Sequence, residues 1–600
     1  MWMIERSRRM SVMIGIIVTV VSLLILRLAW MQLVHGPQYK KVAEENRIHQ
    51  VTAQAPRGNI YDRNGALLVT NRPSFAVAII PAEYSYDRKE TVILANMIGI
   101  QPELIEKMLK DGEDSPYIPV IVKRDIDSVL QTKILERRDE LPGVSIEAVP
   151  VRQYIYKDLA AHVLGFLGSI DEKQYAARKA QGYKPTDFVG KDGVELEWEE
   201  VLRGIDGGLQ VEVNAFGEEV QRIGEKKAIA GKGLVLTLDG NLQKAAQDAL
   251  VQQVEISRNI GEPAKGGCAI VLDVHTGGVL AMVSSPGFDP NVFASGISSK
   301  NWNELINHPD HPLTNKGIQS AYPPGSVFKI ITAAAALDMG YVTKEEIFED
   351  NGFYILGGWK FYGWKTEGLG KLTLEDAIAW SSDPVFYELG RRMGVDNLAS
   401  YSLTFGLGQK TGILLQGEDT GLVPTTGWKQ NTYEQPWYPG ETIIAAIGQG
   451  YYLATTLQQA LLLLAVANNG IIYKPMLVDK IINDDGTLVK SYQPEVIHTV
   501  YLRAEIWDVI KNGLVAVTTR GTGAGVFRGI TPTVAGKSGS AETGKGTVHS
   551  WFACYAPAEK PEIAVAVLVE EGGEGSVAAA PVVRKIVEAY FNAKKFKSES

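Results

Sequence analysis

The segment Tyr322-Pro323-Pro324-Gly325-Ser326-Val327-Phe328-Lys329 contains the chain's single Ser-x-x-Lys tetrapeptide, and an apolar run to Leu337 follows it. The prolines end any earlier helix, so Ser326 should lie at or near a helix start. Residues i and i+3 share a helix face, which directs the Lys329 amine towards the Ser326 hydroxyl. A lysine with a lowered pKa can activate a serine nucleophile. Taken alone, so short a pattern is also typical of a helix cap beside a surface lysine.

Two further elements strengthen the nucleophile interpretation. Ser381-Ser382-Asp383 follows a short helix-like segment, and Pro384 should begin the next helix. Lys537-Ser538-Gly539-Ser540 has the pattern of a strand, and Trp551–Ala556 is its expected partner. Gly539 would let a substrate backbone approach closely, while hydroxyls and an ammonium can bind a carboxylate. These elements predict one wall of a cleft.

Lys410-Thr411-Gly412 also matches Lys-[Thr/Ser]-Gly, but it opens a loop-like stretch without a hairpin partner, so we favour Lys537.

Several other kinds of site are excluded. A phosphate loop would need glycine where Thr531 stands, and no Gly-x-Ser-x-Gly elbow occurs. The eight histidines form no metal-spaced pair, and the formal net charge of −9 argues against a nucleic-acid partner. Cys268 and Cys554 lie in strand-like apolar runs, so we expect buried, unpaired thiols.

The N-terminus predicts a membrane anchor. Met10–Leu26 carries no charge, and the apolar stretch through Leu33 is long enough to cross a hydrocarbon core of about 30 Å. Arg6, Arg8 and Arg9 precede it, which keeps the N-terminus in the cytoplasm. A cleaved signal peptide is the alternative, but the apolar core is too long and no Ala-x-Ala site follows.

The 600 residues, 45% hydrophobic and 22% charged, are typical of a globular protein with several domains. The expected fold class is α+β, with an antiparallel sheet packed between helices in the C-terminal domain. Asp239 should cap a helix over Asn241–Ile256. The predicted divisions are a cytoplasmic tail (1–10), an anchor (11–33), an elongated α+β pedestal (34–238), a catalytic domain (239–595) and a tail (596–600).

The ordered set Ser-x-x-Lys, Ser-x-Asn and Lys-[Thr/Ser]-Gly resembles the motifs of serine penicillin-recognising enzymes. Further segments narrow the resemblance to class B penicillin-binding proteins of the elongation type, the penicillin-binding protein 2 group, over nearly the whole chain. The segments that carry it are Arg57–Gly65, Arg152 with Ala161–Gly165, Gly193–Glu195 with Leu202–Gly204, Asp273–Asn291, Trp437–Thr442 and Ile447–Tyr451. Two departures occur: Asp383 stands where most of the superfamily has Asn, and Ser538 and Ser540 stand where Thr is usual.

The resemblance implies a peptidoglycan D,D-transpeptidase of cell-wall elongation and shape maintenance, inhibited by β-lactams. Ser326 would form the acyl-enzyme, Lys329 would act as base, Ser381 would relay a proton and Lys537 would shape the local field. Asp383, Ser538, Gly539 and Ser540 would bind substrate, although Asp383 could instead be a helix cap. Some relatives bind zinc nearby through Cys and His, but Ser382 and Leu369 occupy those positions here, so neither a metal nor another cofactor is expected.

The implied ligands are stem peptides, as D-alanyl-D-alanine donor and as amine acceptor. The implied protein partners are a SEDS-family glycosyltransferase and other membrane proteins of the elongation complex, at the bacterial cytoplasmic membrane. Two rival functions stay open. A serine β-lactamase would share the acylation step, but no Glu-x-x-Leu-Asn segment lies between Ser381 and Lys537. A non-catalytic scaffold or β-lactam sensor is the other, although a sensor would need a cytoplasmic output domain.

Overall fold

The computed structural model describes residues 2–36, 48–111, 119–213 and 219–599. The chain divides into two compact units. The first comprises Met1–Ala55, Ser74–Val149 and Ile205–Ile229, and the second comprises Pro56–Pro73, Pro150–Gly204 and Ala230–Ser600. Two stretches that the sequence assigns to the pedestal, Pro56–Pro73 and Pro150–Gly204, therefore pack in the unit that holds the C-terminal residues. The predicted domain boundaries remain predictions.

The second unit is built around a five-stranded antiparallel sheet with the strand order β12-β11-β23-β22-β21. The strands are β11 (Gly266–Asp273), β12 (Val279–Ser285), β21 (Ala535–Glu542), β22 (Val548–Ala556) and β23 (Ile563–Glu570). The sequence predicts all five as strands, from the apolar runs Ala269–Val274, Val279–Ser284, Val534–Ala541, Trp551–Ala556 and Ile563–Glu570. The tight turn His275-Thr276-Gly277-Gly278 predicts the antiparallel pairing of β11 with β12. The α+β fold class is confirmed.

Both faces of this sheet are buried, because successive side chains of a strand point to opposite faces. Along β11, Cys268, Ile270 and Leu272 pack in one core, and Ala269 and Val271 pack in the other. The same alternation runs through β23. A sheet covered on both faces needs nearly continuous apolar strands, which is the pattern that the sequence shows there.

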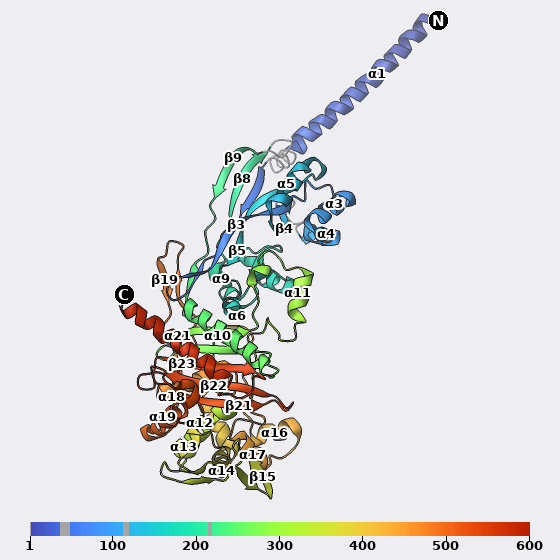
Figure 1. The fold of residues 1–600 in the computed structure, drawn as a ribbon. Coiled ribbons are helices and arrows are strands. Elements are labelled where there is room, and N and C mark those ends of the chain that lie inside the picture. Colours follow the sequence, from blue (N-terminus) through green and yellow to red (C-terminus); the bar gives the residue numbers. More distant parts are fainter. Residues whose placement is uncertain (1, 37–47, 112–118, 214–218, 600) are drawn as a thin grey trace. The chain divides into compact units, whose positions relative to one another are not determined.

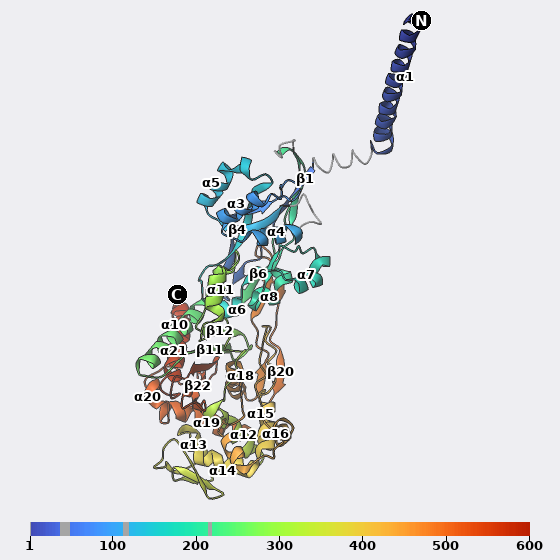
Figure 2. The same ribbon diagram turned by 90° about the vertical axis from the view of Figure 1, so that its right-hand side faces the viewer.

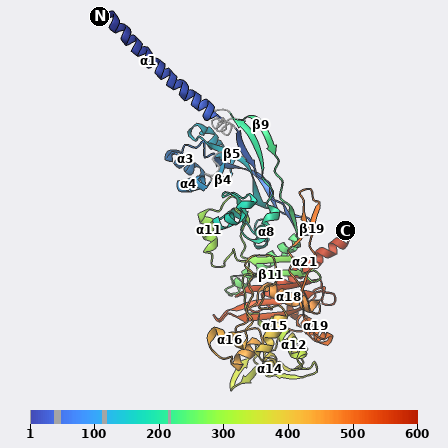
Figure 3. The ribbon, with the colours of Figure 1, turned by 180° about the vertical axis from the view of Figure 1, so that it is seen from behind.

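Helices from distant parts of the chain cover the two faces. Figure 1 shows α10 (Gly240–Asn259) and α21 (Ala579–Glu599) together on one face, and α18 (Thr456–Ala467) packs against β11, β22 and β23 from the other, in the view of Figure 3. The Asp239 side chain accepts hydrogen bonds from the backbone N–H groups of Asn241 and Leu242, so the predicted helix cap is confirmed. Helix α21 continues through Glu599, past the start of the predicted tail.

Both cysteines are free and buried, as predicted from their apolar surroundings. Cys268 lies in the core on the α18 face of the sheet and contacts the Thr456 hydroxyl at 2.9 Å. Cys554 lies in the core on the face that α10 and α21 cover. The sheet therefore separates the two thiols.

The remaining helices that position the site form a group beside the sheet, seen in Figure 2 around α12, α13, α14 and α19. Their bounds are α12 (Lys329–Asp338), α13 (Leu374–Ala379), α14 (Asp383–Met393), α15 (Val395–Thr404), α16 (Thr426–Tyr433), α17 (Pro439–Ala445) and α19 (Ala504–Thr519). Strands β14 (Phe353–Leu356) and β15 (Trp359–Tyr362) form a hairpin. Residues Lys329 to Leu337 of α12 are all buried, so this helix is central.

In the first unit, β1 (Ile48–Ala53), β8 (Gly207–Val213) and β9 (Glu219–Lys226) form an antiparallel sheet. A separate core joins β4 (Val120–Ile126) to α3 (Arg88–Ile98), α4 (Pro102–Asp111) and α5 (Ser128–Glu136).

Helix α1 (Trp2–Ala29) continues as a π-helical turn to Val34. Among the described residues, one helix is long and apolar enough to cross a membrane: Met13–Val34, with a mean hydropathy of 2.3. The sequence also predicts that a polar stretch, Tyr39–Gln54, leaves the membrane, and this stretch lies partly outside the described residues.

Candidate active site

Ser326 lies in a short 3-10 turn, η5 (Gly325–Phe328), directly before α12, which agrees with the predicted helix start. Gly325 has a φ of 55°, and a Cβ on it would lie 3.1 Å from the Ser540 carbonyl oxygen. Glycine therefore suits both the backbone conformation and the close contact. The Ser326 side chain is half-buried, and within the described ranges its hydroxyl makes no hydrogen bond. No described residue holds this hydroxyl in a hydrogen bond, so it is available to react.

Lys329 is the first residue of α12, and its side chain is fully buried. Its ammonium donates to the Ser381 carbonyl oxygen at 2.9 Å, to Ser381 Oγ at 3.2 Å and to Asp383 Oδ1 at 2.7 Å. The sequence spacing predicted that this amine would point to Ser326, but the structure has no hydrogen bond between them. The Asp383 carboxylate and the Ser381 oxygens engage the ammonium instead, since charge-assisted hydrogen bonds are the stronger ones.

Ser381 lies between α13 and α14, and its hydroxyl oxygen accepts hydrogen bonds from two lysines. Lys329 Nζ is 3.2 Å away and Lys537 Nζ is 2.9 Å away. Ser381 is buried and has a φ of 55°, a left-handed conformation that a non-glycine residue adopts at a cost of about 1–3 kcal/mol. The surrounding contacts hold this strained residue where its oxygen joins both ammonium groups.

Lys537 lies on β21, as predicted, and its side chain is fully buried. Besides Ser381, its ammonium donates to the Ser538 carbonyl oxygen at 2.8 Å. Burial, reinforced by the positive charge of Lys329, holds the pKa of Lys537 well below its usual value. Burial also lowers the pKa of Lys329, and the Asp383 carboxylate partly opposes that shift. Two amines that release protons more readily than ordinary lysines thus meet at one hydroxyl.

Strand β21 is the edge of the sheet, and it packs against the turn that carries Ser326. A Cβ on Gly539 would lie 3.4 Å from the Ser326 backbone nitrogen and 3.2 Å from the Trp551 Cβ. Any side chain at position 539 would therefore crowd the turn. Glycine here brings the backbone of β21 close to the turn that carries Ser326. The predicted role of Gly539, to let a substrate backbone approach closely, stays a prediction.

The two serines that flank Gly539 have different surroundings. Ser538 is buried, and its hydroxyl lies 2.8 Å from the Thr522 hydroxyl. Ser540 is exposed, its Oγ accepts from the Gly575 backbone N–H at 3.2 Å, and its carbonyl oxygen accepts from Gln449 Nε2 at 3.3 Å. The structure thus joins to this strand two residues that sequence reasoning missed, Thr522 and Gly575, and it gives a contact to Gln449, which lies in the resemblance segment Ile447–Tyr451 but had no assigned role.

Asp383 is the first residue of α14, but it is not the helix cap. The cap is Ser382, whose Oγ accepts from the Val385 backbone N–H at 3.4 Å. The Asp383 carboxylate instead pairs with Lys329 and accepts from the Trp364 backbone N–H at 3.1 Å. The alternative of a simple cap at Asp383 is therefore wrong, and its carboxylate belongs to the lysine cluster.

Residues from the segment 350–364, which sequence reasoning missed, form hydrogen bonds with the backbone and side chains around Ser381. The Ser382 hydroxyl donates to buried Asp350 Oδ2 at 2.5 Å, and Asp350 Oδ1 accepts from the Gly352 backbone N–H at 2.8 Å. Trp364 Nε1 donates to the Trp380 carbonyl oxygen at 2.9 Å. No local sequence pattern marks these partners, because the contacts are formed by residues remote in the chain.

The second Lys-Thr-Gly match lies elsewhere. Lys410-Thr411-Gly412 lies in a loop, where the Thr411 backbone N–H and hydroxyl both bond to the Glu418 carboxylate. It shares no contact with the Ser326 cluster.

In the part of the chain that the structure describes, no group of three or more His, Cys, Asp or Glu side chains could hold a metal ion. The prediction of no zinc is based on Ser382 and Leu369, and the Ser382 hydroxyl donates a hydrogen bond to the Asp350 carboxylate.

Comparison with protein families assigns both parts of the chain. Residues 267–588 match the penicillin binding protein transpeptidase domain, and residues 52–236 match the penicillin-binding protein dimerisation domain. The chain belongs to the penicillin-binding protein family. This family membership gives the enzyme its reaction class, that of a peptidoglycan D,D-transpeptidase.

Individual relatives of this penicillin-binding protein support the assignment over most of its length. The peptidoglycan D,D-transpeptidase MrdA of Haemophilus influenzae is 32% identical over 94% of this chain and 88% of its own. A complex between penicillin-binding protein 2 and MreC from Helicobacter pylori contains a chain with 26% identity and a TM-score of 0.75, covering 91% of this chain and 99% of that one.

A third relative comes from a structure on the structural coordination of polymerization and crosslinking by a peptidoglycan synthase complex. It has 31% identity and a TM-score of 0.72, and it covers 97% of this chain and 98% of that one. The family resemblance predicted from the motifs is therefore confirmed.

Proposed function

We propose that this penicillin-binding protein cross-links peptidoglycan stem peptides through an acyl-enzyme on Ser326. The observation that carries the proposal is the convergence of two buried lysines, Lys329 and Lys537, on the Ser381 hydroxyl beside an unengaged serine. Burial lowers the pKa of both amines, which favours the unprotonated form that a general base for a serine nucleophile requires.

In the acylation step, Ser326 Oγ attacks the carbonyl carbon between the two D-alanines of a donor. The hydroxyl proton passes to Lys329, acting as base, either directly or through Ser381. The carbon–nitrogen bond then breaks, and Ser381 delivers a proton to the leaving D-alanine nitrogen. The backbone N–H groups of Ser326 and Ser540 stabilise the oxyanion, an effect of about 2.7–4 kcal/mol per donor in well-studied hydrolases.

The substrate groups match the remaining residues. The hydroxyls of Ser538 and Ser540, with Lys537 behind them, suit the terminal carboxylate of the donor. Gly539 leaves room for the donor backbone along β21. Asp383 orients Lys329 and offers a carboxylate to the donor amide. In the second half-reaction an amine of another stem peptide attacks the acyl carbon and releases Ser326.

The same proposal assigns a location and partners. Helix Met13–Val34 would anchor the chain once in the bacterial cytoplasmic membrane, with the N-terminus in the cytoplasm because of Arg6, Arg8 and Arg9. The relatives in complexes with MreC and in a synthase complex support elongation-complex partners, including a SEDS-family glycosyltransferase. β-Lactams would acylate Ser326 as donor mimics.

Mass spectrometry of the penicillin-treated protein tests the proposal. One penicillin should remain attached, and proteolysis should locate it on the peptide that contains Ser326. With nitrocefin we expect a single stoichiometric burst. Sustained turnover would favour the β-lactamase alternative, and an unmodified protein would leave only the scaffold alternative.

Ser381→Ala should lower the rate of acylation by about 10²–10³-fold, because both lysines lose the hydroxyl that joins them. Stopped-flow measurement with a fluorescent penicillin would give this rate. Ser381→Gly separates catalysis from strain: it should unfold at a higher temperature than Ser381→Ala, since glycine tolerates a φ of 55°, yet it should be equally slow. A glycine variant that recovered the rate would show that the hydroxyl is unnecessary.

The acylation rate should rise with pH as Lys329 loses its proton, with a midpoint below the ordinary pKa of lysine. Asp383 raises the pKa of Lys329, so Asp383→Asn should lower that pKa further and shift the midpoint to a lower pH. The pH profile of penicillin acylation measures the shift. Asp508→Asn, an exposed carboxylate on α19, is the matched control and should leave the midpoint in place. A midpoint that Asp383→Asn raised or left unchanged would contradict Lys329 as base.

A further inference from the structure

A carboxylate at the end of β23, that of Glu570, connects the sheet to the segment that carries Ser326. Its Oε1 accepts a hydrogen bond from the Tyr322 hydroxyl at 2.7 Å, and its Oε2 accepts one from the Lys316 ammonium at 2.7 Å. Tyr322 opens the segment that ends at Ser326. Only 13% of the Glu570 side chain is exposed, and Lys316 and Tyr322 are buried. The proposed reaction assigns no role to these three residues.

Stability alone does not account for this nearly buried ion pair. Taking two charges out of water costs free energy, and an apolar pair of similar volume is often as stable or more stable. Glu570 nevertheless uses both of its oxygens, one on the Lys316 ammonium and one on the Tyr322 hydroxyl. An apolar residue at position 570 could not accept from Tyr322. What the carboxylate adds to the fold is therefore a fixed position for the tyrosine.

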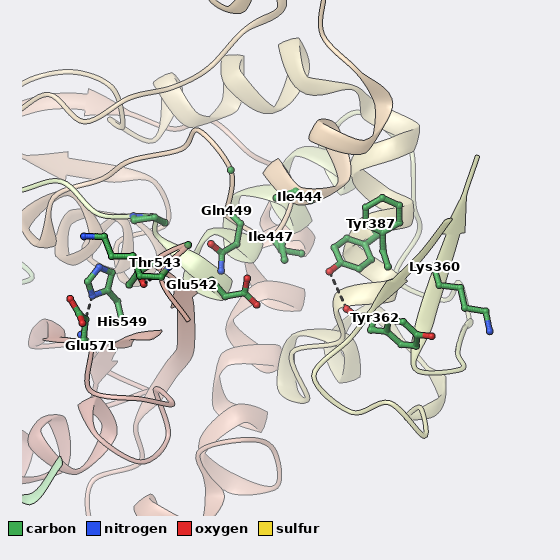
Figure 4. A pocket seen from close by; sticks show the side chains of 15 residues that line it. Lys360, Tyr362, Tyr387, Ile444, Ile447, Gln449, Glu542, Thr543, His549 and Glu571 are labelled. Atoms are coloured by element: carbon green, nitrogen blue, oxygen red, sulfur yellow. Dashed lines mark hydrogen bonds between the residues drawn. The ribbon is translucent and has the colours of Figure 1, made fainter. Parts of the chain in front are cut away.

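The neighbouring ionisable groups do not compete for this bond. Burial and the charge of Glu570 raise the pKa of Tyr322, so the phenol keeps the proton that it donates. The His549 ring packs edge-on against the Tyr322 ring, with 5.2 Å between the centroids. Its Nδ1 accepts from the Glu571 backbone N–H at 3.1 Å, a contact drawn in Figure 4, and burial lowers its pKa. The Lys265 ammonium pairs with the Glu571 carboxylate at 2.5 Å.

The chain between Tyr322 and the nucleophile is short and stiff. Two consecutive prolines follow Tyr322, and each proline ring fixes its φ near about −65°. Beyond them, the Gly325 backbone N–H donates to the Gly448 carbonyl oxygen at 2.9 Å. Trp551 Nε1 donates to the Pro323 carbonyl oxygen at 3.0 Å. Because the prolines leave few torsions to absorb a displacement of Tyr322, such a displacement reaches the turn that carries the serine.

From these contacts we infer that Glu570 is a positioning residue for acylation, which acts through Tyr322 to hold Ser326 where it can attack the donor carbonyl. The inference rests on the proposed function and adds a residue to it. Acyl transfer is sensitive to such placement, because a shift of about 1 Å at the reacting atoms can cost about 10²-fold in rate. Loss of the Tyr322–Glu570 bond should therefore slow acylation of the bound donor without weakening its binding.

Tyr322→Phe removes the bond and keeps the ring. Rapid mixing of the full-length enzyme with benzylpenicillin at several concentrations separates the binding constant from the acylation rate constant. We expect a rate constant about tenfold below that of the wild type, with an unchanged binding constant. Tyr401→Phe is the matched control, because the Tyr401 hydroxyl also donates to a carboxylate, that of Asp338 at 2.5 Å, at the far end of α12 from the serine. It should leave the rate constant unchanged.

Two double variants test the acceptor without leaving an unpaired charge. The variant Lys316→Met, Glu570→Gln keeps a side-chain oxygen that can accept from Tyr322, and the variant Lys316→Met, Glu570→Leu has none. We expect the first to acylate within about twofold of the wild-type rate constant and the second about tenfold more slowly. A purely structural role of the ion pair would not separate them, because both variants lack the pair.

A wild-type rate constant in Tyr322→Phe overturns the inference, and so do equal rate constants in the two double variants. Misfolding lowers the amount of penicillin bound per chain, which the same experiment measures, so it is not mistaken for slow acylation. If the double variants do not fold, Tyr322→Phe alone decides. A wild type that benzylpenicillin does not acylate would instead refute the proposed function itself.

Discussion

Ser326→Ala should abolish covalent labelling by a fluorescent penicillin, because it removes the oxygen that the proposed acyl-enzyme ester requires. The variant should fold as well as the wild type. The Ser326 hydroxyl is half-buried and makes no hydrogen bond within the described part of the chain, so its removal leaves no partner unsatisfied. We expect its free energy of unfolding to stay within about 0.5 kcal/mol of the wild-type value.

Gel fluorescence after denaturation measures the label, and chemical unfolding measures the stability. Ser538→Ala is the matched control: it removes a hydroxyl from the same site, next to Thr522, and should slow labelling without abolishing it. Labelling of Ser326→Ala that survives denaturation would show that another residue carries the acyl group.

Lys329→Met should slow acylation by about 10²–10⁴-fold, the usual contribution of a positioned general base. Methionine fills the buried space along the start of α12 but cannot accept a proton. The substitution also leaves the Asp383 carboxylate without its cation, although the Trp364 backbone N–H still donates to it. Rapid-mixing kinetics with a chromogenic β-lactam gives the rate, and thermal unfolding shows whether the variant is folded.

The double variant Lys329→Met, Asp383→Asn distinguishes loss of the base from the effect of an unpaired carboxylate. Neutralising Asp383 should recover part of any lost stability, since a partly buried charge that loses its partner is destabilising. It should not recover the rate. A double variant as fast as the wild type would mean that Lys329 serves only to neutralise Asp383.

Local patterns predicted the elements of the site well. The apolar runs gave the five strands of the sheet, with β23 matching at both ends, and the Asp239 cap follows from residue type and position. Each of these features depends on residues close together in the chain. The order of the strands in the sheet, and the division of the chain into two units, depend on contacts across hundreds of residues and could not be derived in this way.

The hydrogen bonds among the site residues could be predicted only in part. The motifs named Ser326, Lys329, Ser381 and Lys537, and the structure brings the last three into one hydrogen-bonded cluster beside the turn of the first. The spacing of Ser326 and Lys329 suggested a direct hydrogen bond, which the structure does not contain. A helical spacing fixes which side chains share a face, but it cannot show that Asp383, brought in by another helix, competes for the amine.

The pairing of β11 with β23 has a consequence for the biogenesis of this enzyme. Gly266 opposes Glu570, so the centre of the sheet joins the beginning and the end of the segment Ala230–Ser600. Lys537 and the edge strand also reach the ribosome exit long after Ser326. We therefore expect the nascent domain to stay unfinished until its last strands are synthesised, since contacts between distant segments form slowly. A chain cut short before β23 would carry every residue of the proposed chemistry and still lack the sheet that assembles them.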